Sequence, residues 1–307
     1  MNTRTPLLTA IAVVLGLAGN ASAVPITALT NTGTLVSFDS ATPGTILNTV
    51  TLSGITGGDA VVGIDYRPLD GLLIGLGYNS GTGTARVYSI TAAGVATSIN
   101  ANTLTLGAGL ARVTADFNPT ANAIRVVTSA ATANDLRITT AGTGAQANDT
   151  DLNPANTGIR STAYSRNNAG GGTSGATTLY EIDGTNNALV TQGSIDFFTG
   201  SGTSPNTGTL TSVAALTGVT GSAIVGFDIF NAPGTAASSP GTAFVATSTA
   251  LSTLNLSTGA ATPNGTIGSG LTIVDIAAVP EPGSVVLCGL AAVYFAGRRR
   301  RVALRQA

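Results

Sequence analysis

Short segments in which apolar and polar residues alternate recur along residues 24–279, and Gly, Asn, Thr and Pro separate them. Alternation with a period of two turns one face of a strand toward a packed layer, so these segments predict β-strands. The same stretch contains no convincing amphipathic helix. The pattern therefore predicts an all-β body.

One segment recurs as an apolar strand that ends in Asp. Its copies are residues 61–65, 113–116, 224–228 and 273–275, with 159–164 as a degenerate copy. Successive spacings of 51, 47, 65 and 47 residues separate Asp65, Asp116, Ala163, Asp228 and Asp275. A second strand segment follows at residues 36–39, 88–91, 136–139, 180–183 and 254–257. A period of roughly 50 residues, with about four short strands in each, is typical of a β-propeller blade.

The order of the copies predicts how the ring closes. The strand at residues 273–275 has no partners downstream, and the first copy, residues 26–52, has no leading Asp strand. Together they complete one blade, which removes the open sheet edges. We therefore predict five blades, with the last strand innermost in the first blade. An insert near residues 196–208 leaves the strand register of the fourth blade open, and a β-sandwich or an open stack of sheets is the alternative fold.

Both ends of the chain have the pattern of targeting signals. Residues 1–23 combine Arg4, an apolar run at residues 7–17 and a small-residue cleavage motif at Ala21 and Ala23. This pattern predicts a secretory signal peptide, with Val24 as the first mature residue. An apolar run of 11 residues is too short to span a bilayer of about 30 Å, which argues against a permanent anchor.

The C-terminal signal has three parts, residues 280–307. Pro280, Glu281 and Pro282 precede an apolar segment at residues 285–297, which predicts a short membrane helix. A basic cluster follows, made of Arg298, Arg299, Arg300 and Arg301. Arginines favour the cytoplasmic side, so the body upstream is expected outside the inner membrane. A plain tail anchor is the alternative.

This tail resembles the PEP-CTERM sorting signal of Gram-negative bacteria. The resemblance covers residues 279–307, and it implies processing by an exosortase, a membrane peptidase, after transient anchoring. The body, from about residue 26 to 278, resembles a family of uncharacterised secreted bacterial proteins whose domain has no known function. The resemblance rests on residues 62–68, 116–119, 124–127, 134–137, 178–183 and 226–229. It implies a propeller-like fold and no particular activity.

Composition excludes several kinds of function. The chain of 307 residues has no His, no Lys and one Cys, since all 13 basic residues are Arg. Ser-His-Asp catalysis, His-ligated zinc, Schiff-base chemistry and a P-loop are therefore excluded. Residues 24–279 hold 7 arginines against 13 carboxylates, a net charge of −6. An acidic body without a basic patch argues against nucleic-acid binding.

Hydrolysis by paired carboxylates is the enzyme chemistry that remains. Asp65, Asp116, Asp228 and Asp275 are its candidates, as residues lining the channel of a propeller glycoside hydrolase or lyase. The alternative is that each Asp accepts backbone N–H bonds in the turn after its own strand. Because the four repeat in register, we favour the structural interpretation and predict no enzymatic activity.

Two further candidates are weaker. Asp149, Asp151 and Asn153 offer oxygen ligands at alternate positions, but Pro154 stands where an EF-hand needs Gly. A looser Ca²⁺ site is the remaining alternative, and we expect no other cofactor. Arg125 and Arg137 lie on adjacent predicted strands, where a structural ion pair with Asp135 or Asp116 is expected rather than an anion site.

We therefore predict a protein exported across the inner membrane by signal peptidase and exosortase, to the cell surface or extracellular matrix. There it would act as a non-enzymatic structural or glycan-binding propeller, with an exopolysaccharide or surface glycan as partner.

Overall fold

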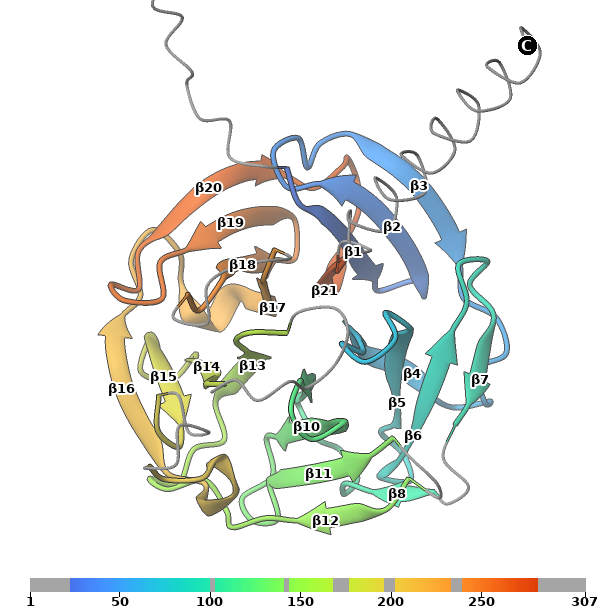
Figure 1. Cartoon of the computed structure of the whole chain (residues 1–307). Coiled ribbons are helices and arrows are strands. Elements are labelled where there is room, and N and C mark those ends of the chain that lie inside the picture. Colours follow the sequence, from blue (N-terminus) through green and yellow to red (C-terminus); the bar gives the residue numbers. More distant parts are fainter. Residues whose placement is uncertain are drawn as a thin grey trace, which may run out of the picture.

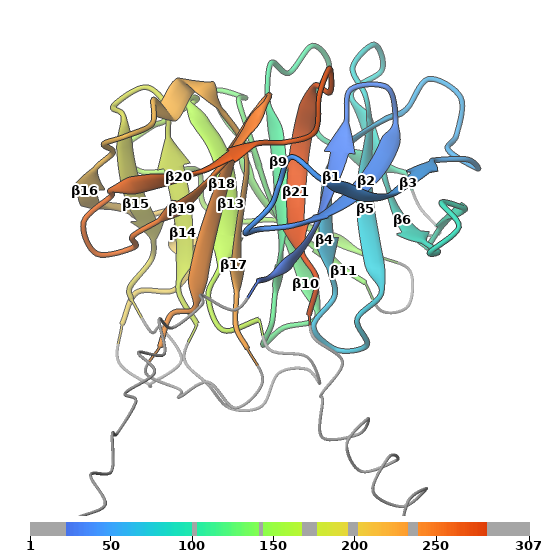
Figure 2. The ribbon, with the colours of Figure 1, turned by 90° about the horizontal axis from the view of Figure 1, so that it is seen from above.

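The computed structural model describes residues 23–99, 103–140, 144–167, 177–195, 202–232 and 239–280. These residues form five antiparallel sheets that surround a common axis (Figure 1) and stand side by side around the ring (Figure 2). The predicted five-bladed propeller is confirmed, and no α-helix occurs in the described ranges. Among these residues no helix has the length and apolar character needed to cross a membrane. The apolar segment 285–297 lies outside them.

In each blade the strands follow one another from the axis outward. The first blade contains β21 (Ile273–Ala278), β1 (Pro25–Thr30), β2 (Thr34–Asp39) and β3 (Ile46–Thr51). The second contains β4 (Ala60–Tyr66), β5 (Leu73–Asn79), β6 (Thr84–Ile90) and β7 (Ala96–Ser98), and β8 (Leu104–Thr105) also pairs with β6. The third contains β9 (Val113–Asn118), β10 (Ala123–Thr128), β11 (Asp135–Thr139) and β12 (Gln146–Asn148).

The fourth blade contains β13 (Ile159–Tyr164), β14 (Leu179–Asp183), β15 (Ala188–Gln192) and β16 (Leu210–Ala215). The fifth contains β17 (Ile224–Phe230), β18 (Thr242–Thr247), β19 (Ala250–Leu254) and β20 (Ala261–Thr266). Two short 3₁₀ turns, η2 (Pro205–Thr207) and η3 (Gly221–Ala223), lie in connections of the fourth and fifth blades.

Closure of the ring follows the prediction. Strand β21 pairs antiparallel with β1, and Ile26 lies opposite Ala278. The last strand is therefore the innermost strand of the first blade, and no other blade joins distant parts of the chain. The Asp-bearing copies, with the degenerate copy at residues 159–164, all form innermost strands.

The strand register of the fourth blade, which the sequence left open, is given by the structure. Residues 180–183 belong to β14, which is the second strand of that blade, whereas residues 36–39, 88–90 and 136–139 belong to third strands. The predicted insert lies in the connection from β15 to β16, where Gly193 N–H and Leu210 N–H donate to Thr209 and Asn153 carbonyl groups.

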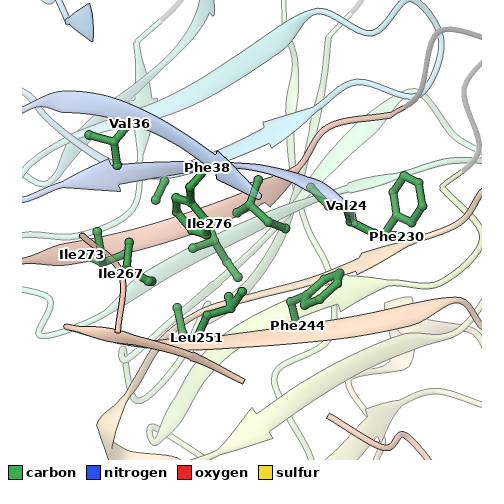
Figure 3. Close-up of a cluster of buried hydrophobic side chains, with 13 residues drawn as sticks. Val24, Val36, Phe38, Phe230, Phe244, Leu251, Ile267, Ile273 and Ile276 are labelled. Atoms are coloured by element: carbon green, nitrogen blue, oxygen red, sulfur yellow. The ribbon is translucent and has the colours of Figure 1, made fainter. Parts of the chain in front are cut away.

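Each hydrophobic cluster lies between two neighbouring blades. Between the fifth and first blades, Phe230 and Phe244 pack toward Val36, Phe38 and the residues around Ile276 (Figure 3). Comparable clusters fill the first–second, second–third and fourth–fifth interfaces. Between the third and fourth blades the apolar cluster has only five buried members, and charged side chains take the remaining space. Burial between sheets is thus what holds the ring together.

Candidate functional site

Four aspartates lie around the axis of the ring, and we call them the aspartate ring. Strands β4, β9, β17 and β21 carry Asp65, Asp116, Asp228 and Asp275, while β13 has Ala163 at the corresponding place. Their exposed fractions are 6%, 3%, 1% and 7%. The four candidates of the catalytic interpretation thus all lie on innermost strands of the ring, but they are almost inaccessible to solvent.

Each carboxylate connects two blades. Atom Oδ2 of Asp65 accepts from Phe117 N–H at 2.8 Å, and Oδ2 of Asp116 accepts from Tyr164 N–H at 2.7 Å. Each donor lies on the innermost strand of the next blade. That strand has no ladder partner on its inner edge, so its N–H groups need acceptors from elsewhere.

The other two members repeat this contact. Oδ2 of Asp228 accepts from Ala278 N–H at 2.6 Å, and Oδ2 of Asp275 accepts from Ile64 N–H at 2.8 Å. The expectation that each Asp closes the turn after its own strand is therefore wrong. Oδ1 of Asp65 and Oδ1 of Asp228 also accept from the N–H of the residue that follows each on its own strand, at 2.6 Å. The Oδ2 atoms act as clamps between blades, because the unpaired strand edges supply the N–H groups.

The fourth blade, which lacks the Asp, uses different contacts. The backbone N–H of Arg166 donates to Oδ1 of Asn231 in the fifth blade at 2.7 Å. Here the earlier blade donates and the next blade accepts, whereas at the aspartates the earlier blade accepts. The Arg112 side chain donates to backbone carbonyl groups of β13 and β17, each at 2.6 Å. Burial lowers the pKa of Arg112 to about 10. One half-buried guanidinium therefore joins the third, fourth and fifth blades near the start of their innermost strands.

Three of the four carboxylates come close together. One oxygen each of Asp65, Asp116 and Asp228 lies within 4.8 Å of the other two. Burial raises the pKa of Asp65 well above 3.8, and the charge of Asp228 raises it further. Burial, followed by the charges of Asp65 and Asp228, does the same for Asp116. Burial raises the pKa of Asp228 to about 6 and that of Asp275 to about 8.

This chemistry limits what the three carboxylates can do. Like charges at this distance cannot all be ionised in a buried place, so the group must hold protons or share a cation. Carboxylate oxygens suit Ca²⁺ or Mg²⁺, which would take further ligands from water or backbone carbonyl groups. A cavity of about 10 Å³, lined by Asp65 and Asp116 among others, has a volume that suits about one water molecule.

A second charged cluster lies between the third and fourth blades. Arg125 Nη1 contacts Asp135 Oδ1 and Asp149 Oδ2, each at 2.6 Å, and Arg137 Nε contacts Asp149 Oδ2 at 2.6 Å. The predicted structural ion pair of Arg125 with Asp135 is confirmed. Asp116, the other partner predicted for the two arginines, forms a salt bridge with neither of them in the described part of the chain.

Two further buried side chains belong to this interface. Both carboxyl oxygens of Glu181 and Oε1 of Gln192 are buried, and neither side chain has a hydrogen-bond partner for these atoms among the described residues. Burial, with the charge of Asp135, raises the pKa of Glu181 well above 4.5. A buried acid without partners is predominantly protonated at neutral pH. Only its position as the single Glu of residues 24–279 set it apart in the sequence.

The weaker candidates are placed as follows. Both oxygens of Asp149 accept from arginine side chains, and Oδ1 of Asp151 accepts from Asn134 N–H at 3.4 Å. Calcium at Asp149, Asp151 and Asn153 would compete with those arginines, and it stays a prediction. Of the processing residues, Val24 is buried at the fifth–first interface and Ala23 is exposed. Ala21, Glu281, Pro282 and the arginines 298–301 lie outside the described residues.

Comparisons place these features in a family. The model of a domain of unknown function, DUF4394, matches residues 34–277. None of the curated proteins matches the chain.

Solved structures that are similar to the chain include two bacterial proteins. One is a functionally unknown protein from Desulfotomaculum acetoxidans, at 16% identity and TM-score 0.40, covering 85% of this chain and 76% of that one. Another is a protein from Lactobacillus plantarum, at 14% identity and TM-score 0.38, covering 80% and 67%. A chain of a nidogen–laminin complex is 10% identical with TM-score 0.40, covering 84% and 98%.

Proposed function

Since the chain belongs to the DUF4394 family, whose function is unknown, and folds as a five-bladed propeller, we propose its role from its own residues. It is an exported, non-enzymatic protein of the cell surface or exopolysaccharide matrix, with a structural or glycan-binding role. An N-terminal signal peptide and a PEP-CTERM tail read by an exosortase deliver it there.

One observation supports this proposal over catalysis. Each member of the aspartate ring accepts a backbone N–H bond from the next blade and is at most 7% exposed. A catalytic carboxylate must reach the proton that it transfers, directly or through one water molecule. Carboxylates used as clamps inside the ring serve its stability.

Fractionation of the producing bacterium tests the delivery. We expect the protein at the surface or in the matrix, without residues 1–23. Replacing Pro280 and Pro282 with alanine should keep the protein in the inner membrane, while the same change at Pro68, in the body, should not. Intact protein in the cytoplasm would contradict the proposal.

A glycan array, including the exopolysaccharide of the same cell, tests the binding role of the purified exported protein. We expect retention of at least one surface glycan and no release of sugar from it.

A glycoside hydrolase or lyase is the second candidate, favoured by one observation. Two carboxylates within 4.8 Å with raised pKa values resemble the spacing of about 5–5.5 Å in retaining glycosidases. Sugar released from a polysaccharide panel by the wild type, and lost in Asp65→Asn and Asp116→Asn, would establish the enzyme and overturn the non-enzymatic role. The variant Asp39→Asn, outside the aspartate ring, is the control.

A further inference from the structure

A pocket of about 280 Å³ opens between the first and second blades. Strands β1, β2 and β3 form one wall, and the ends of β4 and β6 with the start of β5 form the other, two groups that lie side by side in Figure 1. The volume is near the lower end of the range for small-molecule sites, about 300–1,000 Å³. Its location is separate from the aspartate ring and from the charged cluster around Arg125.

The first-blade wall presents a row of polar side chains. Thr27 lies directly opposite Ser37, and Ser37 lies directly opposite Asn48, on three adjacent strands. Directly opposite residues point to the same face of a sheet. Since neighbouring strands are about 4.8 Å apart, the row extends over roughly 10 Å. It offers two hydroxyl groups and one amide, all of which can both donate and accept.

The second-blade wall is mostly apolar, with one aromatic residue. Leu73 and Ile90 belong to the buried hydrophobic cluster between these blades, and the partly buried Tyr66 packs against that cluster and lines the pocket. The Tyr66 hydroxyl group and Thr27 Oγ1 are 2.9 Å apart, so a hydrogen bond connects the two walls. The polar row thus lies on the first-blade wall beside Leu35 and Val50, and the second-blade wall is mostly carbon surface with the hydroxyl groups of Tyr66 and Thr91.

No charged side chain is among the residues that line this pocket, all of which belong to the described part of the chain. A charged ligand would leave water here without an ion partner, which is costly. A neutral ligand with many hydroxyl groups on its edges and C–H groups on its faces matches both walls. We infer that this pocket binds a neutral saccharide unit of a surface glycan, an inference that rests on the glycan-binding role proposed above.

Calorimetric titration of the exported protein tests this inference. The probes are cellotetraose, xylotetraose and mannotetraose as neutral sugars, and tetragalacturonate as the charged comparison. The variants Ser37→Ala and Asn48→Leu remove polar groups from the row; the first adds no bulk, and the second keeps the branched shape of the side chain. The control Thr49→Leu lies next to Asn48 on β3, where alternation directs its side chain to the opposite face.

We expect at least one neutral tetrasaccharide to bind, and each row variant to weaken it about tenfold, the effect of losing one hydrogen bond. The control should bind as the wild type does. Because Asn48 is exposed, N48L should keep the ring folded, which an unchanged melting temperature confirms.

Three results would overturn the inference. Equal binding by the wild type and both row variants would exclude this pocket, while the glycan-binding role would stand with its site elsewhere. Binding of tetragalacturonate alone would exclude a neutral ligand. Failure of the wild type to bind any glycan on the array would remove the glycan-binding role, and this pocket with it.

Discussion

The substitution Asp116→Asn tests whether the aspartate ring is held in the protonated state by burial and by like charges. Oδ2 of Asp116 accepts the Tyr164 N–H bond, and an asparagine carbonyl oxygen can take over that bond. The new NH₂ group can then donate to Asp65 or Asp228, whose nearest oxygens lie within 4.8 Å. The variant therefore keeps the clamp and removes one carboxyl group from the trio.

The size of the expected difference in the free energy of unfolding follows from the raised pKa values. A rise from 3.8 to about 6, as for Asp228, corresponds to ~3 kcal/mol. A group whose pKa is raised in the native state keeps its proton up to a higher pH there than in the unfolded chain. The free energy of unfolding therefore falls as pH rises from 3.8 through the native pKa. Burial also raises the pKa of Asp116, and the charges of Asp65 and Asp228 raise it further, so we expect D116N to be more stable than the wild type at pH 8, by on the order of the same amount.

Urea unfolding followed by far-UV circular dichroism measures this difference. Samples at pH 4 and pH 8 contain EDTA, which prevents a cation from compensating the charges. We expect only a small part of this gain at pH 4, where the native carboxyl groups are protonated and those of the unfolded chain are partly protonated. Asp39→Asn, whose carboxylate accepts from its own turn, is the matched control and should show no comparable gain. A variant less stable than the wild type at pH 8, or an equal difference at both pH values, would refute the reasoning.

Three further predictions concern stability and are measured by urea unfolding. Glu181→Leu removes a buried acid without hydrogen-bond partners and should raise the free energy of unfolding at pH 8 by about 1–3 kcal/mol; a loss would mean that Glu181 has a partner in solution. Arg125→Met leaves Asp135 buried without its cation and should cost about 3–5 kcal/mol, and a neutral effect would contradict the buried ion pair. Gly226→Ala places a Cβ 2.7 Å from a backbone nitrogen of β21, so it should lower the melting temperature by several degrees. The control Gly57→Ala, whose Cβ would have nothing within 4 Å, should not lower it. Equal effects of the two variants would show that the innermost strands can move apart.

The fold was largely predictable because its signal repeats. The spacing of Asp65, Asp116 and Asp228 marks equivalent positions in successive blades, and the unpaired strand at residues 273–275 indicates the closure. The second strand of the fourth blade was harder to place. The long connections on both sides of β14 and β15 obscure the period there, and β14 resembles the third strands of other blades.

The site was predictable in position but not in role. Repetition showed that the aspartates would meet at the axis, yet nothing local reveals that each bonds to the next blade. Those contacts join residues about 50 or, for Asp275 and Ile64, 211 positions apart, and depend on how the sheets are arranged. The row of Thr27, Ser37 and Asn48 was equally hidden, because it exists only through the pairing of three strands.

The pairing of β1 with β21 has a consequence for the order in which the protein forms during synthesis. Synthesis from the N-terminus delivers β1 first, and β1 keeps an open edge until the final strand arrives. An open edge is a template for pairing with other chains. The four blades between residues 60 and 266 can assemble early, but the first blade completes only with residues 273–278. Any processing at the C-terminal tail must therefore leave these residues attached.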